Sequence, residues 1–215
     1  MNIRLATWFL ITAAIGGEGL AAQMAQADVY LSDRDDSGQL LCAGKAVAAE
    51  IFARSGVQLV WRSRELPNAK GAGRQEFARL AFGIRTLERA PDTLGDAVVA
   101  TTRIVNFQGK EITIYADRLT RLISRRGDLA QVAAGYVLAH ELAHAMQGIA
   151  RHSETGILKA SWSNEDYQQM VWRKLAFTPM DVELIHRGIA FQLANAQSGP
   201  ADSGNAVLAM GFRWR

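Results

Sequence analysis

Apolar residues recur at helical spacing in two long segments of the chain. Residues 39–54 form the first segment, and its apolar positions lie on or near one face: Leu41, Val47, Ile51 and Phe52. Residues 127–148 carry the stronger pattern, with Asp128 suited to the start of a helix and Gly148 suited to its C-terminal cap. The sequence therefore predicts two helices that each bury one side.

Shorter segments alternate apolar and polar residues with the period of a strand. Residues 28–31 and 55–61 flank the first helix, and this order favours a parallel pair in an α/β layer. Residues 76–88 alternate well enough for a strand, although a helix fits them nearly as well. Residues 109–119 are the clearest strand, and residues 89–99 are typical of a loop.

Two further helix starts follow the histidine-rich region. Ser-Asn-Glu-Asp at 163–166 has a serine cap with an acid three residues later, and Thr-Pro-Met-Asp at 178–181 adds a proline in the first helical position. Residues 195–206, after the helix that begins near Thr178, are polar and typical of a flexible segment. The last residues, 207–215, either dock back on the domain or are disordered. We expect a folded domain over 28–194 and a flexible C-terminal tail over 195–215.

The N-terminus has the pattern of a secretory signal peptide. Arg4 supplies a positive charge, residues 5–15 form an apolar stretch too short to span a bilayer, and Ala25-Gln26-Ala27 fits the small-x-small cleavage rule. We expect removal of residues 1–27, which leaves a secreted or periplasmic protein. An uncleaved N-terminal anchor is the alternative, and no other segment is long and apolar enough to cross a membrane.

Length, charge and cysteine content limit the class of protein. A chain of 215 residues suits one domain with a tail. The net charge is +3, and the basic residues are scattered among acidic ones, so the chain lacks the basic stripe of a nucleic-acid-binding protein. The single cysteine, Cys42, has no partner for an internal disulfide, and its place in the first predicted helix indicates a small buried apolar residue.

Three of the four histidines lie close together in the sequence. His140 and His144 belong to a His-Glu-x-x-His pattern on the stronger predicted helix. Residues four apart lie on one helix face, so both imidazoles can reach a single metal ion. Glu141 lies beside them, where its carboxylate can act as a base toward a water molecule without binding the metal.

A catalytic zinc ion usually has three protein ligands and one open position. The third ligand must lie outside the helix, because a straight helix cannot wrap around its own metal. His152 follows His144 by eight residues, after the glycine that ends the helix, and we predict that it completes the site. Glu165 and Asp166 are the rival third ligands, and His186 is expected to be structural.

The His-Glu-x-x-His pattern, a glycine and a nearby third histidine together resemble the metzincin clan of zinc peptidases. The loop is two residues longer than the usual spacing of the clan, and Leu158 stands where its methionine turn would have methionine. "HSETGIL" (152–158), the following "KASW" and "IFARSGVQLVW" (51–61) are similar to an uncharacterised group of secreted bacterial metzincin-like proteins. The resemblance implies a zincin-like α/β (α+β) fold, in which a small mixed twisted sheet packs on helices and the C-terminal part is helical.

The resemblance also implies a secreted zinc metallopeptidase. His140, His144 and His152 would hold Zn2+, and Glu141 would be the general base for hydrolysis of a peptide or protein substrate. We expect a monomer with no membrane span after signal cleavage. The alternatives are a non-catalytic zinc-binding domain on a peptidase scaffold, or a zinc amidase or other hydrolase of non-peptide substrates. Glu141 argues against the non-catalytic domain, because a structural zinc site needs no base.

Substrate binding in the metzincin arrangement suggests two further expectations. The strand at 109–119, which precedes the motif, would be an edge strand to which an extended substrate adds. Tyr115 or Tyr167 could stabilise the oxyanion, although packing is the expected role of each.

Overall fold

The computed structural model describes seven segments of the chain: 24–31, 37–62, 80–96, 98–105, 109–124, 127–198 and 209–213. The strands within them are β1 (Ala25–Leu31), β2 (Val57–Arg62), β3 (Leu80–Leu87), β4 (Val98–Val105), β5 (Gly109–Tyr115) and β6 (Ala209–Arg213). The α-helices are α1 (Ser37–Arg54), α2 (Ala116–Ser124), α3 (Ala130–Gln147), α4 (Asn164–Val171) and α5 (Pro179–Ser198). A short 3-10 helix, η1 (Gly127–Leu129), leads directly into α3.

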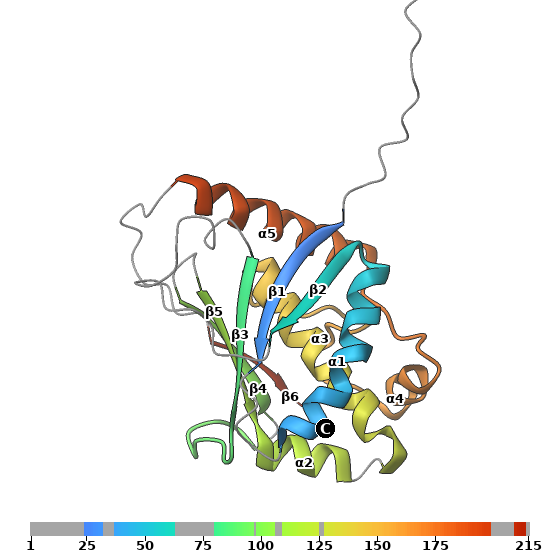
Figure 1. Ribbon diagram of the computed structural model, residues 1–215. Coiled ribbons are helices and arrows are strands. Elements are labelled where there is room, and N and C mark those ends of the chain that lie inside the picture. The colour runs from blue at the N-terminus through green and yellow to red at the C-terminus, as the bar shows by residue number, and fades with distance from the viewer. Residues whose placement is uncertain are drawn as a thin grey trace, which may run out of the picture.

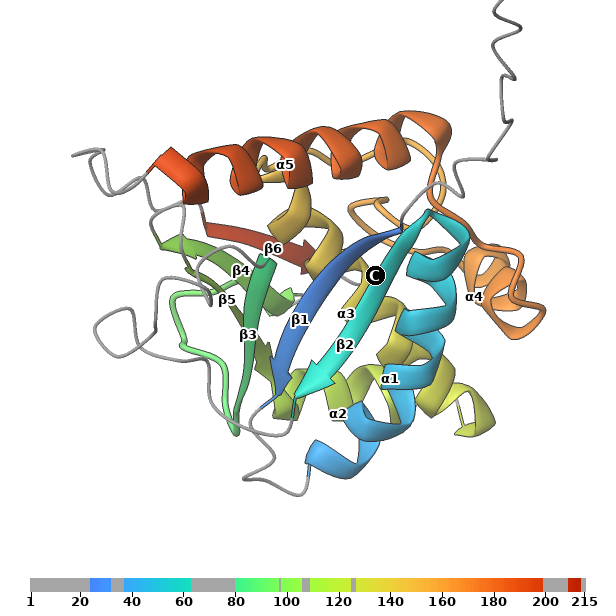
Figure 2. The ribbon, with the colours of Figure 1, turned by 45° about the horizontal axis from the view of Figure 1, so that its top comes forward.

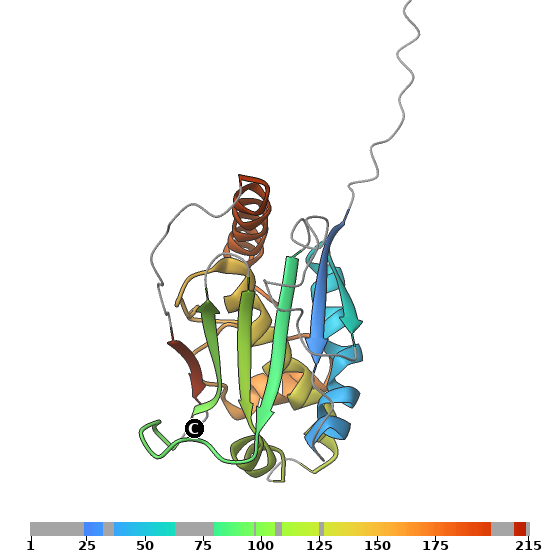
Figure 3. The ribbon, with the colours of Figure 1, turned by 60° about the vertical axis from the view of Figure 1, so that its left-hand side comes forward.

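One mixed sheet holds six strands in the order β2-β1-β3-β5-β4-β6. The first four are parallel, β4 is antiparallel to β5, and β6 is antiparallel to β4. Figure 3 shows β2 and β6 at the two edges of the sheet, with α1 and α3 behind it. The helix α1 connects β1 to the parallel strand β2, as a crossover between parallel neighbours requires (Figure 1).

The core lies between the sheet and this helical layer. The central strands contribute fully or almost fully buried apolar side chains: Val29, Leu31, Phe82, Ile84, Ile112 and Ile114. Residues 133–147 of α3 are all buried, whether apolar or polar. The helix that carries the histidine motif is therefore enclosed by protein, and its side chains are held by packing.

Three glycines allow the neighbouring helices to approach α3 closely. A Cβ atom on Gly44 of α1 would lie 2.8 Å from the backbone nitrogen of Gly135 on α3, so only glycine fits there. At Gly188 of α5, a Cβ would overlap the backbone of Met146 and Gln147 at the end of α3. Figure 2 shows α5 lying across this end of the molecule. These two crossings fix the position of α3 against both helices.

The structure confirms much of the expected architecture. The small mixed sheet packed on helices, the parallel pair β1–β2 and the two long helices are all present. Two boundaries were wrong. The strand expected over 109–119 ends at Tyr115, and Ala116 begins α2. The loop expected over 89–99 ends at β4, which begins at Val98 and was not predicted.

The prediction that 109–119 forms an edge strand is wrong. The strand β5 pairs with β3 on one side and with β4 on the other. Its backbone groups are therefore used within the sheet, and an extended peptide has no free edge to join there. The next strand on this side of the sheet is β4, and β6 pairs with the outer edge of β4.

Regular structure extends beyond both expected domain boundaries. Residues 25–27 of the predicted signal peptide lie in β1, where Ala27 is fully buried, whereas residues 1–23 lie outside the described part. At the other end, α5 reaches Ser198 and residues 209–213 form β6, where a flexible tail was expected.

Two smaller findings concern the surface and the membrane. Cys42 is exposed on α1, so the expectation of a buried apolar role is wrong. The helical pattern around it marks a buried face, but Cys42 lies outside that face. Among the described residues, no helix has the length and apolar character needed to span a bilayer.

Candidate metal centre

His140 and His144 lie one turn apart on the buried face of α3. Both side chains are fully buried, and their Nε2 atoms are 3.1 Å apart. The ring centroids are 4.7 Å apart, with the planes close to perpendicular. The four-residue spacing therefore brings two imidazole nitrogens to one point, as the sequence predicted.

The C-terminal end of α3 is anchored by groups from other elements. Gly148 adopts the left-handed conformation, with φ 72° and ψ 17°, and its N–H donates to the His144 carbonyl at 2.9 Å. Gln192 Nε2 donates to the Met146 carbonyl at 2.6 Å, and Lys110 Nζ donates to the Ala145 carbonyl. These bonds satisfy carbonyls that a helix end leaves without partners and hold the turn after His144 in place.

His152 returns to the same point after this turn. Its ring centroid is 5.4 Å from that of His140 and 4.9 Å from that of His144. One ligand nitrogen from each of the three histidines lies within 4.8 Å of the others. The structure thus brings together the three side chains that the sequence singled out, including the one from outside the helix.

The cluster is set up to hold its imidazoles neutral. Burial lowers the pKa of His140 well below its usual range, and a positive charge on His144 would lower it further. Burial, followed by the neighbouring His152, lowers the pKa of His144 to about 4. Burial also lowers the pKa of His152. A neutral imidazole has a free lone pair, which is the form that binds a metal.

The turn after His152 packs against His140. The Ile157 carbonyl accepts hydrogen bonds from His140 Nδ1 at 2.8 Å and from Trp162 Nε1 at 3.1 Å. A carbonyl can only accept, so His140 carries its proton on Nδ1 and presents the Nε2 lone pair to the cluster. The Trp162 ring packs nearly perpendicular to the His140 ring, with centroids 5.9 Å apart. Leu158, which replaces the expected methionine, is fully buried in the same turn.

Asp181 of α5 holds the loop that carries His152. Its Oδ1 accepts hydrogen bonds from Arg151 Nη1 at 2.9 Å and from Ser153 Oγ, the residues on either side of His152. Its Oδ2 accepts from the Thr178 N–H at 3.0 Å. The carboxylate is fully buried. The sequence identified Asp181 only as an acid in the first turn of a helix, because its contacts with the His152 loop are not visible in local sequence.

Glu141 is buried beside the histidines and is held by β4. The Thr102 hydroxyl donates to Glu141 Oε2 at 2.6 Å. Both side chains are fully buried. The hydroxyl therefore orients the carboxylate that the sequence identified as the general base. Thr102 lies in the strand that sequence reasoning missed, so it was not a candidate.

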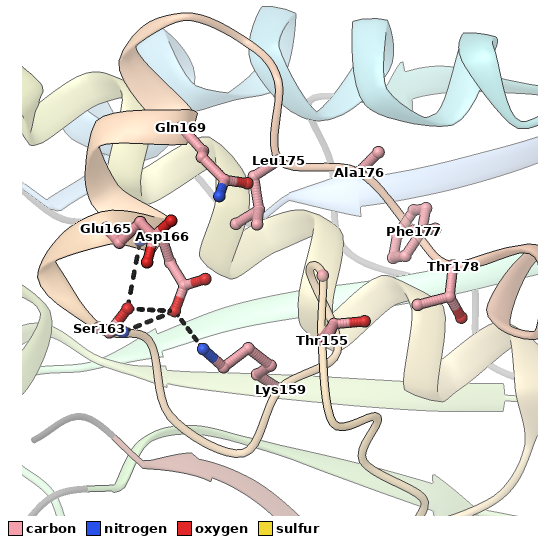
Figure 4. A pocket seen from close by; sticks show the side chains of 11 residues that line it. Thr155, Lys159, Ser163, Glu165, Asp166, Gln169, Leu175, Ala176, Phe177 and Thr178 are labelled. Carbon is pink, nitrogen blue, oxygen red and sulfur yellow. Dashed lines mark hydrogen bonds and ion pairs between the residues drawn. The ribbon is translucent and has the colours of Figure 1, made fainter.

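The rival third ligands lie elsewhere. Asp166 Oδ2 accepts from the Ser163 N–H at 2.7 Å and from Lys159 Nζ, within the capping box of α4. Figure 4 shows these bonds at one side of a pocket of about 420 Å³ that Glu165 and Asp166 help to line. None of the three clustered histidines lines this pocket. Among the described residues, neither acid joins the metal-binding cluster.

The other candidates have packing or structural contacts. Tyr115 shares a hydrogen bond of 3.0 Å with Thr101, and the ring of Tyr167 packs edge-on against Trp162 with centroids 6.1 Å apart. His186 Nε2 donates to the Ser55 carbonyl at 2.7 Å and so links α5 to the turn after α1. These contacts agree with the packing and structural roles expected for them.

The cluster fits a divalent metal ion. Within the described residues, His152 Nε2 is buried without a hydrogen-bond partner. A buried nitrogen in this state is costly unless a ligand satisfies it. Three imidazoles are also a common ligand set for catalytic zinc. The structure thus contains a possible three-histidine metal site.

No protein-family model matches the chain, and no curated protein matches it. Among solved structures, the chain is similar to an archaemetzincin from Methanopyrus kandleri, with 15% sequence identity and a TM-score of 0.44. The alignment covers 79% of this chain and 98% of that one. A likeness of this size carries no functional conclusion, which must come from the site residues.

Proposed function

We propose that this chain is a secreted zinc metallopeptidase that hydrolyses peptide bonds with Glu141 as the general base. The observation that carries the proposal is the convergence of His140, His144 and His152 beside the buried Glu141 carboxylate. This arrangement combines a metal-ligand set with an acid that is not needed as a ligand. Metal-assisted hydrolysis requires both.

Each residue would have a distinct part in the reaction. The three histidines would hold the zinc ion, which when bound supplies Lewis acidity toward water and a carbonyl oxygen. Glu141 would accept a proton from the attacking water and then deliver it to the leaving amine. The Thr102 hydroxyl, 2.6 Å from Glu141 Oε2, would keep the carboxylate in one orientation during both transfers. The Ile157 carbonyl would fix the His140 tautomer.

The size of the ligand set favours catalysis over a structural zinc site. Structural sites usually have four protein ligands, whereas catalytic sites have three and leave one position for water or substrate. Within the part of the chain that the structure describes, the cluster has three members. This count supports the peptidase proposal over a non-catalytic zinc-binding domain.

Substitution of Glu141 tests the proposal. We expect Glu141→Gln to keep zinc but to slow cleavage of a peptide library by about 10²-fold or more, because the amide cannot take up the proton. Glu165→Gln is the matched control, since Glu165 lies on α4 outside the cluster, and it should cleave like the unchanged chain. Equal rates for Glu141→Gln and the unchanged chain would contradict the proposal. Zinc-loaded protein that cleaves non-peptide amides but no peptides would favour the amidase alternative.

Export is the second part of the proposal, and the pattern of residues 1–27 supports it. The mass of the protein recovered outside the cytoplasm of a bacterial host tests it. A mass that lacks the N-terminal segment is expected, and an intact chain retained inside the cell would argue against export. Cleavage after Ala27 would also remove three residues of β1, so the same mass shows whether the whole strand is kept.

A further inference from the structure

We propose that the C-terminal strand β6 is an internal occupant of the substrate-binding edge and restrains the peptidase until it is displaced. This inference rests on the proposed peptidase function and adds a means of regulation to it. The strand β4 contacts the general base through the hydrogen bond from Thr102 to Glu141. It also packs against α3, the helix that carries the histidine motif.

One edge of β4 is used for pairing with β5, and β6 takes the other. The pairing is antiparallel, and its register places Met210 opposite Thr102. Adjacent strands are about 4.8 Å apart, so the β6 backbone runs one strand spacing from the residue that orients Glu141. The strand β6 also contacts α3. Figure 3 shows it (dark red) along the outer side of β4.

An extended peptide binds a sheet edge by forming the same main-chain hydrogen bonds. Within the described sheet, the edge beside Glu141 is the outer side of β4, because β5 is paired on both sides. While β6 is in place, a substrate cannot form a strand ladder there. The chain therefore supplies its own competitor for the edge that an extended substrate would use.

The competition is intramolecular and can still be reversed. Only ten residues, 199–208, separate the end of α5 from β6, so the strand is tethered close to its binding edge. A short tether gives an effective concentration on the order of 1 mM, and a segment with an intrinsic dissociation constant of about 0.1 mM would weaken an added peptide about tenfold. The strand has five residues, so a longer substrate can form more bonds and displace it.

A disulfide between direct partners tests the proposal in the full chain. Thr101 lies opposite Gly211, so Thr101→Cys with Gly211→Cys can lock β6 onto β4, with Cys42→Ser to remove the native thiol. Alternate residues of a strand face opposite sides of the sheet, so this link lies on the face away from Thr102. We expect the oxidised protein to have at least about tenfold lower kcat/KM than the reduced protein, with the same zinc content.

Two further variants complete the comparison. Thr101→Cys with Cys42→Ser but without the second cysteine is the redox control and should show no difference between oxidised and reduced forms. Met210→Pro with Gly211→Pro removes two donors from β6, whichever of them bonds to β4, and should lower KM relative to the unchanged chain. Equal kcat/KM for the locked and unlocked proteins would overturn the inference and leave the peptidase function standing.

A binding measurement keeps the inference testable if no form of the protein cleaves peptides. A fluorescent peptide with the sequence of residues 207–215, VLAMGFRWR, serves as the probe in an anisotropy titration. It should bind the double-proline variant and fail to bind the locked protein. That result would support β6 as an occupant of a peptide-binding edge even though the proposed function had failed. Equal binding to both proteins, or binding to neither, would refute the inference.

Discussion

The buried carboxylate of Asp181 offers a prediction about metal affinity at a distance from the metal ligands. Asp181 contacts none of the three histidines through a described hydrogen bond, yet it binds the residues on both sides of His152. Asp181→Asn keeps the size of the side chain and removes its charge. We expect this substitution to weaken zinc binding, because the loop that presents His152 loses its anchor.

The geometry shows why asparagine cannot replace the aspartate. Oδ1 accepts from Arg151 and Ser153, and Oδ2 accepts from the Thr178 N–H, so both oxygens face donors. In either orientation the asparagine NH2 group meets a donor, and the Asp181 site is fully buried. Loss of groups that orient metal ligands typically lowers metal affinity by about 10–100-fold, which corresponds to about 1.4–2.7 kcal/mol.

A competition titration with a chromophoric zinc chelator measures this loss directly. Glu183→Gln is the matched control, because Glu183 lies two residues away on α5 with a half-exposed side chain and pairs with Arg187 in its own helix. We expect the control to bind zinc like the unchanged chain. Circular dichroism of the zinc-free proteins checks that Asp181→Asn still folds, and Ser153→Ala is a milder variant with the same expected direction. Unchanged affinity in both Asp181→Asn and Ser153→Ala would refute the reasoning.

Two further predictions concern the groups around the site. Thr102→Val should lower kcat by about tenfold and leave zinc content unchanged, because Glu141 loses the hydroxyl that orients it. An unaltered kcat in steady-state assays would show that Thr102 has no such role. Asp166→Asn should leave zinc content unchanged but lower the melting temperature, since Asp166 accepts from Ser163 and Lys159. Burial would raise the pKa of Asp166, but these hydrogen bonds outweigh it and hold the pKa below 3.8. The stabilisation is therefore present above the unfolded pKa and is lost as the pH falls through the lower folded value. The difference in melting temperature between the variant and the unchanged chain should be smaller at pH 3 than at pH 7, and a constant difference would contradict this linkage.

The histidine cluster was predictable because its determinants are local. The spacing of His140 and His144 places both on one face of a helix whatever the rest of the fold, and a glycine turn returns the chain within a few residues to His152. Long segments with helical periodicity were predictable for the same reason. The parallel pair β1–β2 followed from the order of strand, helix and strand.

The features that escaped prediction depend on contacts between distant segments. The strand β5 lies inside the sheet because β3 and β4 pair with it, and neither pairing can be recognised from residues 109–119 alone. Asp181 and Thr102 reach the site from elements that lie far away in the sequence. In the local sequence, Asp181 looks like an ordinary acid in the first turn of a helix, and Thr102 looks like an ordinary threonine in a strand. Only the tertiary structure shows what they touch.

The zinc content per chain tests most directly whether the three histidines form one zinc site. The purified full chain and its His152→Ala variant should be loaded with zinc, freed of excess and measured by elemental analysis. We expect about one zinc ion per unchanged chain and loss of most of it in His152→Ala. Equal zinc content in the two proteins would contradict the role of His152. An unchanged chain that binds no zinc, even after refolding with the metal, would contradict the site itself.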